Sequence, residues 1–512
     1  MCGEFSIIKL EIPSEGFVMI RICKNAIKKQ TNFWNNATFH PTDAVEDPWG
    51  KRILDKMAEE RTAKTIRIYA MLEDIVYYDG DGVLKYDFRL NDLRLDYLHG
   101  LGYELLLSYG GMPDCIAKTT NQKSSMSNGK TRYKGKMWNT SMPRDIKVWE
   151  DICYEYTKHI IERYGLDVVS KWSLSCFNEP DASSFFLKEL SSYEQPIERC
   201  EEYCKLYDAF VRGTTRASEG IRIGGPVLAG VPLFFEAFLK HVKETRVRLD
   251  FLSIHNYGTH PSILERNERK ITVDATIEKH EKYLKIIKEQ GFEDTEILMD
   301  EWGVCTSGFR NMSEFPVLEF RETEVFPAYY VKTISEFIKR DYRISKMFIC
   351  LSGQHEMQTD FTGFRGFFTL NFIKKPIYNA YVLASKLHEG LLPFECENDN
   401  LHVIPTKDEN ENYAVLLSYS GEFFEEDIPT VTEKLSFEDD LCGKEVTIYL
   451  IDKNTTNPYR LYQRLGMGEE LSDEEIMILR KEGNLVPIFT GTLSGDVELT
   501  LTPNSTYLVS VC

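Results

Sequence analysis

The sequence lacks long apolar runs and an excess of basic residues. Its longest apolar stretches, residues 346–351 and 413–419, are far shorter than the roughly 18 residues that a membrane-spanning helix needs. Acidic residues outnumber basic ones by 80 to 61, which gives a formal net charge of −19. We therefore expect neither a membrane nor a nucleic-acid partner, because a nucleic-acid binder would carry a basic footprint.

The sequence also lacks closely paired cysteines, and we expect no signal peptide at its start. The 12 cysteines are spread over the chain without CxxC spacing, and Cys200 and Cys204 have the spacing of a shared helix face. The first residues are mixed and charged, without the basic start and apolar centre of a signal peptide. These features predict reduced thiols and a cytoplasmic location.

Motifs for metal and dinucleotide binding are missing as well. The histidines form no HxH or HExxH pair, which argues against a metal-dependent barrel hydrolase. No GxGxxG loop occurs, so an open doubly wound sheet is the less favoured fold. We expect no cofactor, and the sequence leaves the oligomeric state open, a homo-oligomer included.

From about residue 60 to residue 390, short apolar runs alternate with amphipathic stretches of helical period. The runs are apolar on both faces, as in strands of a covered parallel sheet, and they cover residues 65–71, 103–109, 171–177, 221–226, 249–255, 295–301 and 345–351. Helices are predicted at residues 144–165, 196–220, 274–291 and 375–390. With a further strand near residues 16–22, the pattern predicts an α/β fold, the (β/α)8 TIM barrel.

The chain after residue 390 has a different pattern. Apolar and polar residues alternate there, which predicts antiparallel strands with one wet face, and residues 471–483 have a helical period. Residues 5–13 share the β pattern. We expect a barrel over residues 14–390 and an accessory, sandwich-like β domain over residues 391–512 that includes strand 5–13 and supports the barrel.

Acidic residues follow two of the predicted barrel strands. Asn178 and Glu179 come just after the fourth strand, and Asp300 and Glu301 end the seventh. Carboxylates are costly to bury unless they are paired or hydrogen-bonded, and the strand ends of a barrel meet at one face. Two carboxyls in one pocket suit glycoside hydrolysis, in which one is the acid and the other attacks the anomeric carbon or activates water. A non-catalytic carbohydrate-binding barrel would not need both.

Several segments resemble a known enzyme family. "RYGLDVVSKWSLSCFNEPD" is similar to the acid/base segment of barrel glycosidases that carry the acid/base after strand four and the nucleophile after strand seven. More narrowly, "RLDFLSIHNYGTHPSILE", "DTEILMDEWG" and "GFRGFFTLNFIKKPIYNAYVLASKLHEG" resemble glycoside hydrolase family 39, the family of β-xylosidases and α-L-iduronidases. The resemblance covers about residues 60–510. It implies a retaining exo-glycosidase whose catalytic barrel uses Glu179 as general acid/base and Glu301 as nucleophile.

Other residues are expected to contact the glycoside substrate. The resemblance implies sugar or nucleophile contacts for His255 and Tyr257 after strand six. Asn178 can bond a sugar hydroxyl, and the ring of Trp302 suits the C–H face of a sugar. Tyr69 stands where the family typically has a histidine.

The sugar itself depends on recognition at C5. A β-D-xyloside and an α-L-iduronide share the ring geometry at C1 to C4, but the iduronide carries a carboxylate at C5. A cation aimed at C5 would discriminate between them. Arg365 is the candidate, although its expected role is a structural ion pair, and Tyr257 lies near the position of a lysine in the iduronidases. We therefore expect a β-xylosidase, with an α-L-iduronidase-like or other glycosidase of the family as the alternative.

Overall fold

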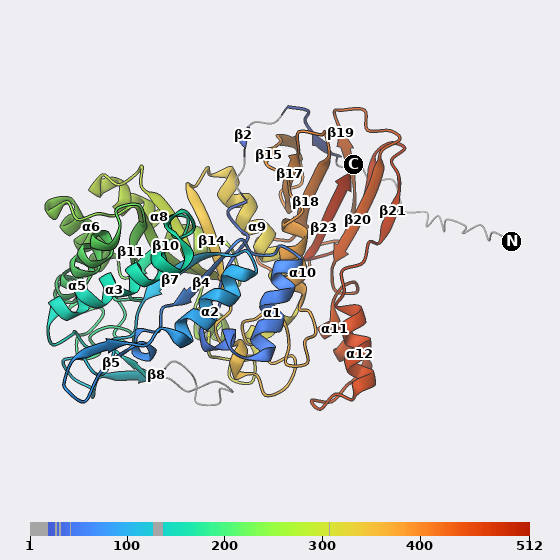
Figure 1. Ribbon diagram of the computed structural model, residues 1–512. Coiled ribbons are helices and arrows are strands. Elements are labelled where there is room, and N and C mark those ends of the chain that lie inside the picture. Colours follow the sequence, from blue (N-terminus) through green and yellow to red (C-terminus); the bar gives the residue numbers. More distant parts are fainter. Residues whose placement is uncertain (1–18, 26–27, 30–31, 41, 126–136, 307) are drawn as a thin grey trace.

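The chain forms a closed barrel with two further sheets beside it (Figure 1). The computed structural model describes residues 19–25, 28–29, 32–40, 42–125, 137–306 and 308–512. Within these ranges no helix has both the length and the apolar character that a membrane span requires. The predicted strand 5–13 lies outside the described residues.

Eight parallel strands close the barrel in the order β10-β11-β12-β13-β14-β3-β4-β7. They are β3 (Asn36–Thr38), β4 (Thr65–Tyr69), β7 (Glu104–Tyr109), β10 (Ser173–Cys176), β11 (Arg222–Leu228), β12 (Phe251–Tyr257), β13 (Glu296–Gly303) and β14 (Ile344–Cys350). All seven strands predicted from apolar runs take part, which confirms the fold class.

The first barrel strand is β3; a strand does form near residues 16–22, but its predicted place in the barrel is wrong. β1 (Met19–Ile22) lies outside the barrel, where it pairs parallel with β19 (Val431–Phe437) and antiparallel with β16 (Phe394–Glu395). Its exposure alternates from residue to residue, as in a strand with one wet face. β3 escaped prediction because its three residues are too few to show a period.

Helices cover the outside of the barrel (Figure 1). They are α1 (Pro48–Glu59), α2 (Arg89–Gly100), α3 (Ile146–Tyr164), α4 (Leu166–Val169), α5 (Pro196–Ala217), α6 (Pro232–Thr245), α7 (Pro261–Glu265), α8 (Asp274–Gln290), α9 (Val325–Lys339) and α10 (Pro376–Ala384). The four predicted helices correspond to α3, α5, α8 and α10. The last is shorter than predicted, since the chain leaves α10 before the short strand β15 (Gly390–Leu391).

Small hairpins decorate the barrel. β5 (Val76–Tyr78) pairs with β6 (Leu84–Tyr86), and β8 (Lys123–Ser125) pairs with β9 (Met137–Asn139). Single turns of 3-10 helix occur at Thr42–Val45, Leu72–Asp74 and Gln354–Glu356, and a longer one at Pro316–Glu322.

The remaining strands form a sandwich. One sheet has the order β2-β15-β17-β18-β23-β20-β21 and the other β16-β1-β19-β22, and apolar side chains from both sheets form one buried cluster. The strands not yet given are β2 (Lys28–Lys29), β17 (Leu401–Lys407), β18 (Tyr413–Tyr419), β20 (Glu445–Ile451), β21 (Phe489–Thr492), β22 (Val497–Leu501) and β23 (Ser505–Val511). A helical hairpin of α11 (Pro458–Leu465) and α12 (Asp473–Glu482) extends below the sheets (Figure 1).

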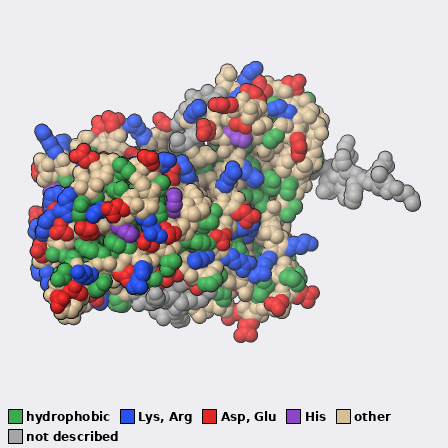
Figure 2. Space-filling view, in the orientation of Figure 1, with side chains coloured by type: hydrophobic (Ala, Val, Ile, Leu, Met, Phe, Trp, Pro, Cys, Tyr) green, Lys and Arg blue, Asp and Glu red, His purple; other side chains and the backbone are tan. Residues whose placement is uncertain are grey.

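The sandwich shares a core with the barrel. α9 packs against β17, β18 and β23, and Ile404, Leu416 and Leu508 belong to the same buried cluster as the side chains of the barrel and its helices. Acidic and basic side chains are interspersed over the face drawn in Figure 2. A domain boundary at residue 390 and a supporting role for the sandwich stay predictions.

Candidate active site

Glu179 lies on a strained turn that follows β10. Phe177 and Glu179 have left-handed backbones with φ of 66° and 43°, a conformation that costs an L-residue roughly 1–2 kcal/mol. Neighbouring strands hold the turn: the Phe177 amide donates to the carbonyl of Tyr109 at 2.7 Å, and the Glu179 amide donates to that of Val227 at 3.0 Å. Such strain persists where the surroundings enforce it, typically at functional positions.

A bulge in β13 brings two consecutive carboxylates into the barrel. The register between β12 and β13 shifts just before His255, which pairs with Glu301 and leaves Asp300 without a partner in the ladder. A bulge interrupts the alternation of faces and re-aims side chains. Both carboxylates therefore approach one guanidinium: Arg67 Nε lies 3.1 Å from Asp300 Oδ2, and Arg67 Nη1 donates to Glu301 Oε1 at 2.7 Å.

Arg67 is a fully buried cation beneath the site. Its Nη2 donates to Asn178 Oδ1 at 2.7 Å, so that it links the ends of β10 and β13. Burial lowers the pKa of Arg67, but the neighbouring Asp300 and Tyr69 raise it by more. The net pKa therefore lies above its usual value, and the guanidinium stays charged. The cation thus offsets the cost of burying two acidic side chains.

Glu301 is held in its ionised form. Its Oε1 accepts from Arg67, and its Oε2 accepts from the Tyr257 hydroxyl at 2.6 Å. Burial raises the pKa of Glu301, but the charges of His255 and Arg67 and these hydrogen bonds outweigh it and bring the pKa to about 2. An ionised carboxylate is therefore present at neutral pH.

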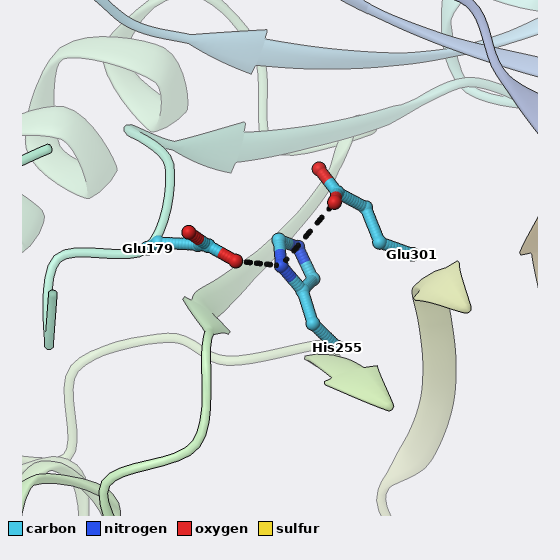
Figure 3. Close-up of side chains that lie close together, drawn as sticks. All are labelled: Glu179, His255 and Glu301. Atoms are coloured by element: carbon cyan, nitrogen blue, oxygen red, sulfur yellow. Dashed lines mark hydrogen bonds and ion pairs between the residues drawn. The ribbon is translucent and has the colours of Figure 1, made fainter. Parts of the chain in front are cut away.

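The His255 imidazole lies between the two glutamates (Figure 3). Its Nδ1 is 2.8 Å from Glu179 Oε1 and 3.7 Å from Glu301 Oε2, and its Nε2 is 3.6 Å from Asp300 Oδ1. Burial lowers the pKa of His255, but Glu301 and Asp300 raise it to about 10, so the ring is protonated at neutral pH. One carboxyl oxygen of Glu179 lies within 4.8 Å of one of Glu301.

A cavity of about 300 Å³ opens over the two glutamates. Six residues expected at the site line it: Tyr69, Asn178, Glu179, Tyr257, Glu301 and Arg365. His255 is fully buried behind the carboxyls. The structure therefore brings these seven residues together at the carboxyl ends of the barrel strands.

Trp302 is not among the described residues that line the cavity, and its burial contradicts the predicted contact with the sugar. The indole is fully buried, and its Nε1 donates a hydrogen bond to the Tyr381 hydroxyl at 3.3 Å. Its ring stacks on that of Tyr330, with ring centres 5.8 Å apart. Tyr330 belongs to α9 and Tyr381 to α10. Trp302 therefore faces the helix layer, because the residue after Glu301 points to the other side of β13.

The ion pair expected for Arg365 is likewise wrong for the part of the chain that the structure describes. Its Nη1 donates to the Tyr257 hydroxyl at 3.0 Å and to Ser352 Oγ at 3.2 Å, and its Nη2 donates to the Cys305 carbonyl at 2.8 Å. Its Cζ lies 4.3 Å from the centre of the Tyr257 ring. Neutral acceptors hold the guanidinium, and the cavity wall therefore carries a cation.

Sequence reasoning missed several residues of the site. His40, Phe309 and Lys279 line the cavity, and Arg67 lies beneath it. Burial and the nearby His355 lower the pKa of His40 to about 3, so its ring is neutral. Arg67 had a signal, since a charged residue inside an apolar strand needs a buried partner. Lys279 had none, because lysines are common on helices.

Glu179, His255 and Glu301 are also close enough together to offer ligands to a metal ion. Their electrostatics favour protons instead. His255 is protonated at neutral pH, whereas a metal ligand must be a neutral imidazole. Both oxygens of Glu301 already accept hydrogen bonds, one of them from the buried Arg67 cation. The arrangement suits acid–base and nucleophilic chemistry by paired carboxyls.

Comparison with known proteins agrees with this chemistry. The β-xylosidase of Caldicellulosiruptor saccharolyticus is 25% identical over 471 residues, which cover 89% of each chain. The α-L-iduronidase of Homo sapiens is 29% identical over 166 residues, which cover 30% of this chain and 23% of the relative. The structure of a monomeric β-xylosidase from Caulobacter crescentus superposes with a TM-score of 0.80 at 19% identity, over 96% of this chain and 99% of the other.

A family model extends this similarity along the chain. The model described as glycosyl hydrolases family 39 matches residues 18–486, which include the barrel, the paired glutamates and most of the sandwich. The chain belongs to glycosyl hydrolases family 39.

Proposed function

We propose that the protein is a retaining exo-glycosidase that hydrolyses β-D-xylosides. The observation that carries this proposal is the approach of the Glu179 and Glu301 carboxyl oxygens to within 4.8 Å. Retaining sites have carboxyls about 5–5.5 Å apart, whereas inverting sites leave roughly 6.5–9.5 Å for a water. The similarity to β-xylosidases over most of the chain supports the sugar.

Two displacements at C1 complete the reaction. In the first, protonated Glu179 gives its proton to the glycosidic oxygen while the C1–O bond breaks, and a Glu301 oxygen forms a bond to C1. The leaving group departs as an alcohol. In the second, ionised Glu179 takes a proton from water, the water oxygen bonds to C1, and Glu301 leaves as a carboxylate. Two inversions give net retention.

The surroundings of Glu301 support its role as the nucleophile. A carboxylate must be ionised to attack, and the bonds from Arg67 and Tyr257 together with the His255 charge keep it so. The same bonds fix the orientation of the attacking oxygens. Placing the reacting group in advance is a main source of enzymatic rate enhancement.

An α-L-iduronide is the second candidate substrate, and Arg365 favours it. The guanidinium lines the cavity on the side of Glu301 and is held by neutral partners. Its planar fork matches a carboxylate with two hydrogen bonds. Three of its donors are already occupied by Tyr257, Ser352 and the Cys305 carbonyl, which argues instead for a role in orienting Tyr257.

A side-by-side assay of a nitrophenyl β-D-xyloside and a methylumbelliferyl α-L-iduronide tests the proposal. We expect kcat/KM to be at least about tenfold higher for the xyloside, a transition-state difference of about 1.4 kcal/mol. Proton NMR of the fresh product should show β-xylose first. Preference for the iduronide would overturn the xyloside assignment, and α-xylose as the first product would overturn retention.

A further inference from the structure

We propose that the leaving-group side of the cavity contains a subsite for an anionic group, a carboxylate or a sulfate, and that Lys279 binds it. The subsite rests on the proposed glycosidase function, because the general acid marks the side of the leaving group. Glu179 must reach the glycosidic oxygen to protonate it. Side chains that line the cavity next to Glu179, away from Glu301, therefore face the leaving group.

Lys279 lies on this side of the cavity. It belongs to α8, which follows β12, and its Nζ donates to the carbonyl of Ala229 at 2.9 Å. Ala229 comes directly after β11, and both residues line the cavity together with Glu179 and Phe185. The subsite is thus built from the loops of the fifth and sixth barrel strands and the turn after the fourth.

The two cations that line the cavity, Arg365 and Lys279, lie near different catalytic carboxyls. Arg365 donates to Tyr257, which in turn donates to Glu301. Burial lowers the pKa of Lys279 overall, against the opposing effect of the Glu179 and Asp181 charges near its ammonium. A glycoside with C1 between the glutamates therefore has its sugar ring towards Arg365 and its leaving group towards Lys279.

Among the described residues no carboxylate lies within ion-pair distance of Lys279 Nζ, although the charges of Glu179 and Asp181 act on it at longer range. The nearby Asp181 is engaged elsewhere, since its oxygens accept from the amides of Ala229, Gly230 and Val231 at 2.8, 2.7 and 2.9 Å. An ammonium has three N–H donors, and the Ala229 carbonyl takes one. Two donors of a half-buried cation are left for a ligand or water in the cavity.

The surroundings of the ammonium are shaped for a second group. A Cβ at Gly230 would lie 3.1 Å from Lys279 Nζ, so the absence of a side chain at this position lets the ammonium pack against the backbone. Phe185 also lines the cavity and is half-buried, and its aromatic face suits a sugar ring or an aromatic leaving group. A ring on Phe185 with an acidic substituent on Lys279 satisfies both features.

Calorimetric binding to a Glu301→Gln protein tests the subsite without turnover. The ligands are the β-D-xylosides of para-hydroxybenzoate, para-hydroxybenzenesulfonate and the neutral para-hydroxybenzamide. We expect at least one anionic ligand to bind about tenfold more tightly than the amide, which is about 1.4 kcal/mol. Adding Lys279→Met should reduce the preference to about twofold or less, whereas Lys279→Arg should keep it. Lys282→Met, an exposed lysine on the same helix, is the matched control and should also keep it.

The outcomes separate the subsite from the proposed function. Equal binding of all three xylosides, or an anion preference that survives Lys279→Met, overturns the subsite and leaves the xylosidase proposal intact. Failure of all three to bind overturns the xyloside assignment and the subsite with it. A preference for the carboxylate alone or the sulfonate alone supports the subsite and identifies the anion.

Discussion

Arg67 and Glu301 are joined by a hydrogen bond of 2.7 Å although they are 234 residues apart in the chain. Arg67 lies in the second barrel strand, and Glu301 lies in the seventh, two residues before its end. The same guanidinium also contacts Asp300 and Asn178. One buried cation thus fixes the positions of an acidic pair and of the residue next to Glu179.

Replacing Arg67 should therefore destabilise the fold. Arg67→Met leaves Asp300 and Glu301 buried without their main cation, and we expect a loss of about 3–5 kcal/mol in the free energy of unfolding. Arg67→Lys should lose less, because it keeps the charge but not the fork. Urea denaturation measures both. Arg89→Met is the control: its ion pair with Asp87 is exposed to solvent and should contribute little to stability, and an equal loss there would contradict the argument.

The sequence was sufficient for seven of the eight barrel strands but only partly for the site. Seven strands have apolar runs long enough to recognise; Glu179 follows one of them, and Glu301 lies near the end of another. The bulge in β13 had no signal in the sequence, because it depends on the register with β12. It decides that Asp300 faces Arg67 and that Trp302 turns away from the cavity.

The errors at β3 and Arg365 have separate causes. β3 has three residues, and such a strand is defined by its neighbours rather than by its own pattern. An ion pair was expected for Arg365, and buried cations do usually have a carboxylate partner. The fold instead supplies two hydroxyls and a carbonyl, which come from three separate segments.

His255 should make stability depend on pH in the alkaline range. Its pKa rises from 6.5 to about 10 on folding, so its contribution is complete below pH 6.5 and is lost as the pH rises through about 10. His255→Gln should therefore flatten the fall in Tm over this range. His280→Gln is the matched control, since burial lowers the pKa of that histidine to about 3. An unchanged alkaline slope in His255→Gln would refute the assignment.

Glu301 should act in the opposite direction. Its pKa falls from 4.5 to about 2 on folding, so its contribution is present above pH 4.5 and is lost as the pH falls towards 2. We expect Glu301→Gln to reduce the steepness of acid unfolding between these values, as followed by circular dichroism. Acid unfolding as steep as in the unaltered protein would show that Glu301 is not held ionised.

The proposed roles of the two glutamates predict different leaving-group dependence. Glu301→Ala should lower kcat/KM by about 10⁴-fold or more on every xyloside, because no nucleophile remains. Glu179→Ala should cost about 10²–10⁴-fold on an alkyl xyloside, which needs a proton, and far less on a dinitrophenyl xyloside. Added azide should restore turnover in Glu179→Ala as the β-azide. Equal losses on both leaving groups would contradict Glu179 as the acid.

The turn that carries Arg365 is anchored by a fully buried ion pair. Lys375 Nζ lies 2.6 Å from Glu322 Oε1 and donates to the Phe364 carbonyl at 2.9 Å. Lys375→Met leaves Glu322 uncompensated and should cost about 3–5 kcal/mol in unfolding free energy, whereas Lys375→Met combined with Glu322→Leu should recover most of it. Urea unfolding of the three proteins tests this. A double variant as unstable as the single one would show that packing, not charge, is lost.

Arg365 decides between the two candidate sugars. If the protein is a xylosidase, Arg365 acts through Tyr257 on Glu301, and Arg365→Met should lower kcat/KM for a xyloside and a uronide by similar factors. Tyr257→Phe is the matched variant, because it removes the hydroxyl that links the two. Combining both changes should then cost little more than either alone, since the effects of residues that act through one contact are not additive.

If Arg365 instead binds a C5 carboxylate, its loss should lower uronide turnover about 10–100-fold more than xyloside turnover, as expected for a lost charged pair of about 1.5–3 kcal/mol. Kinetics on both substrates with the three variants distinguish these outcomes, and the second one would replace the xyloside by the uronide as the substrate.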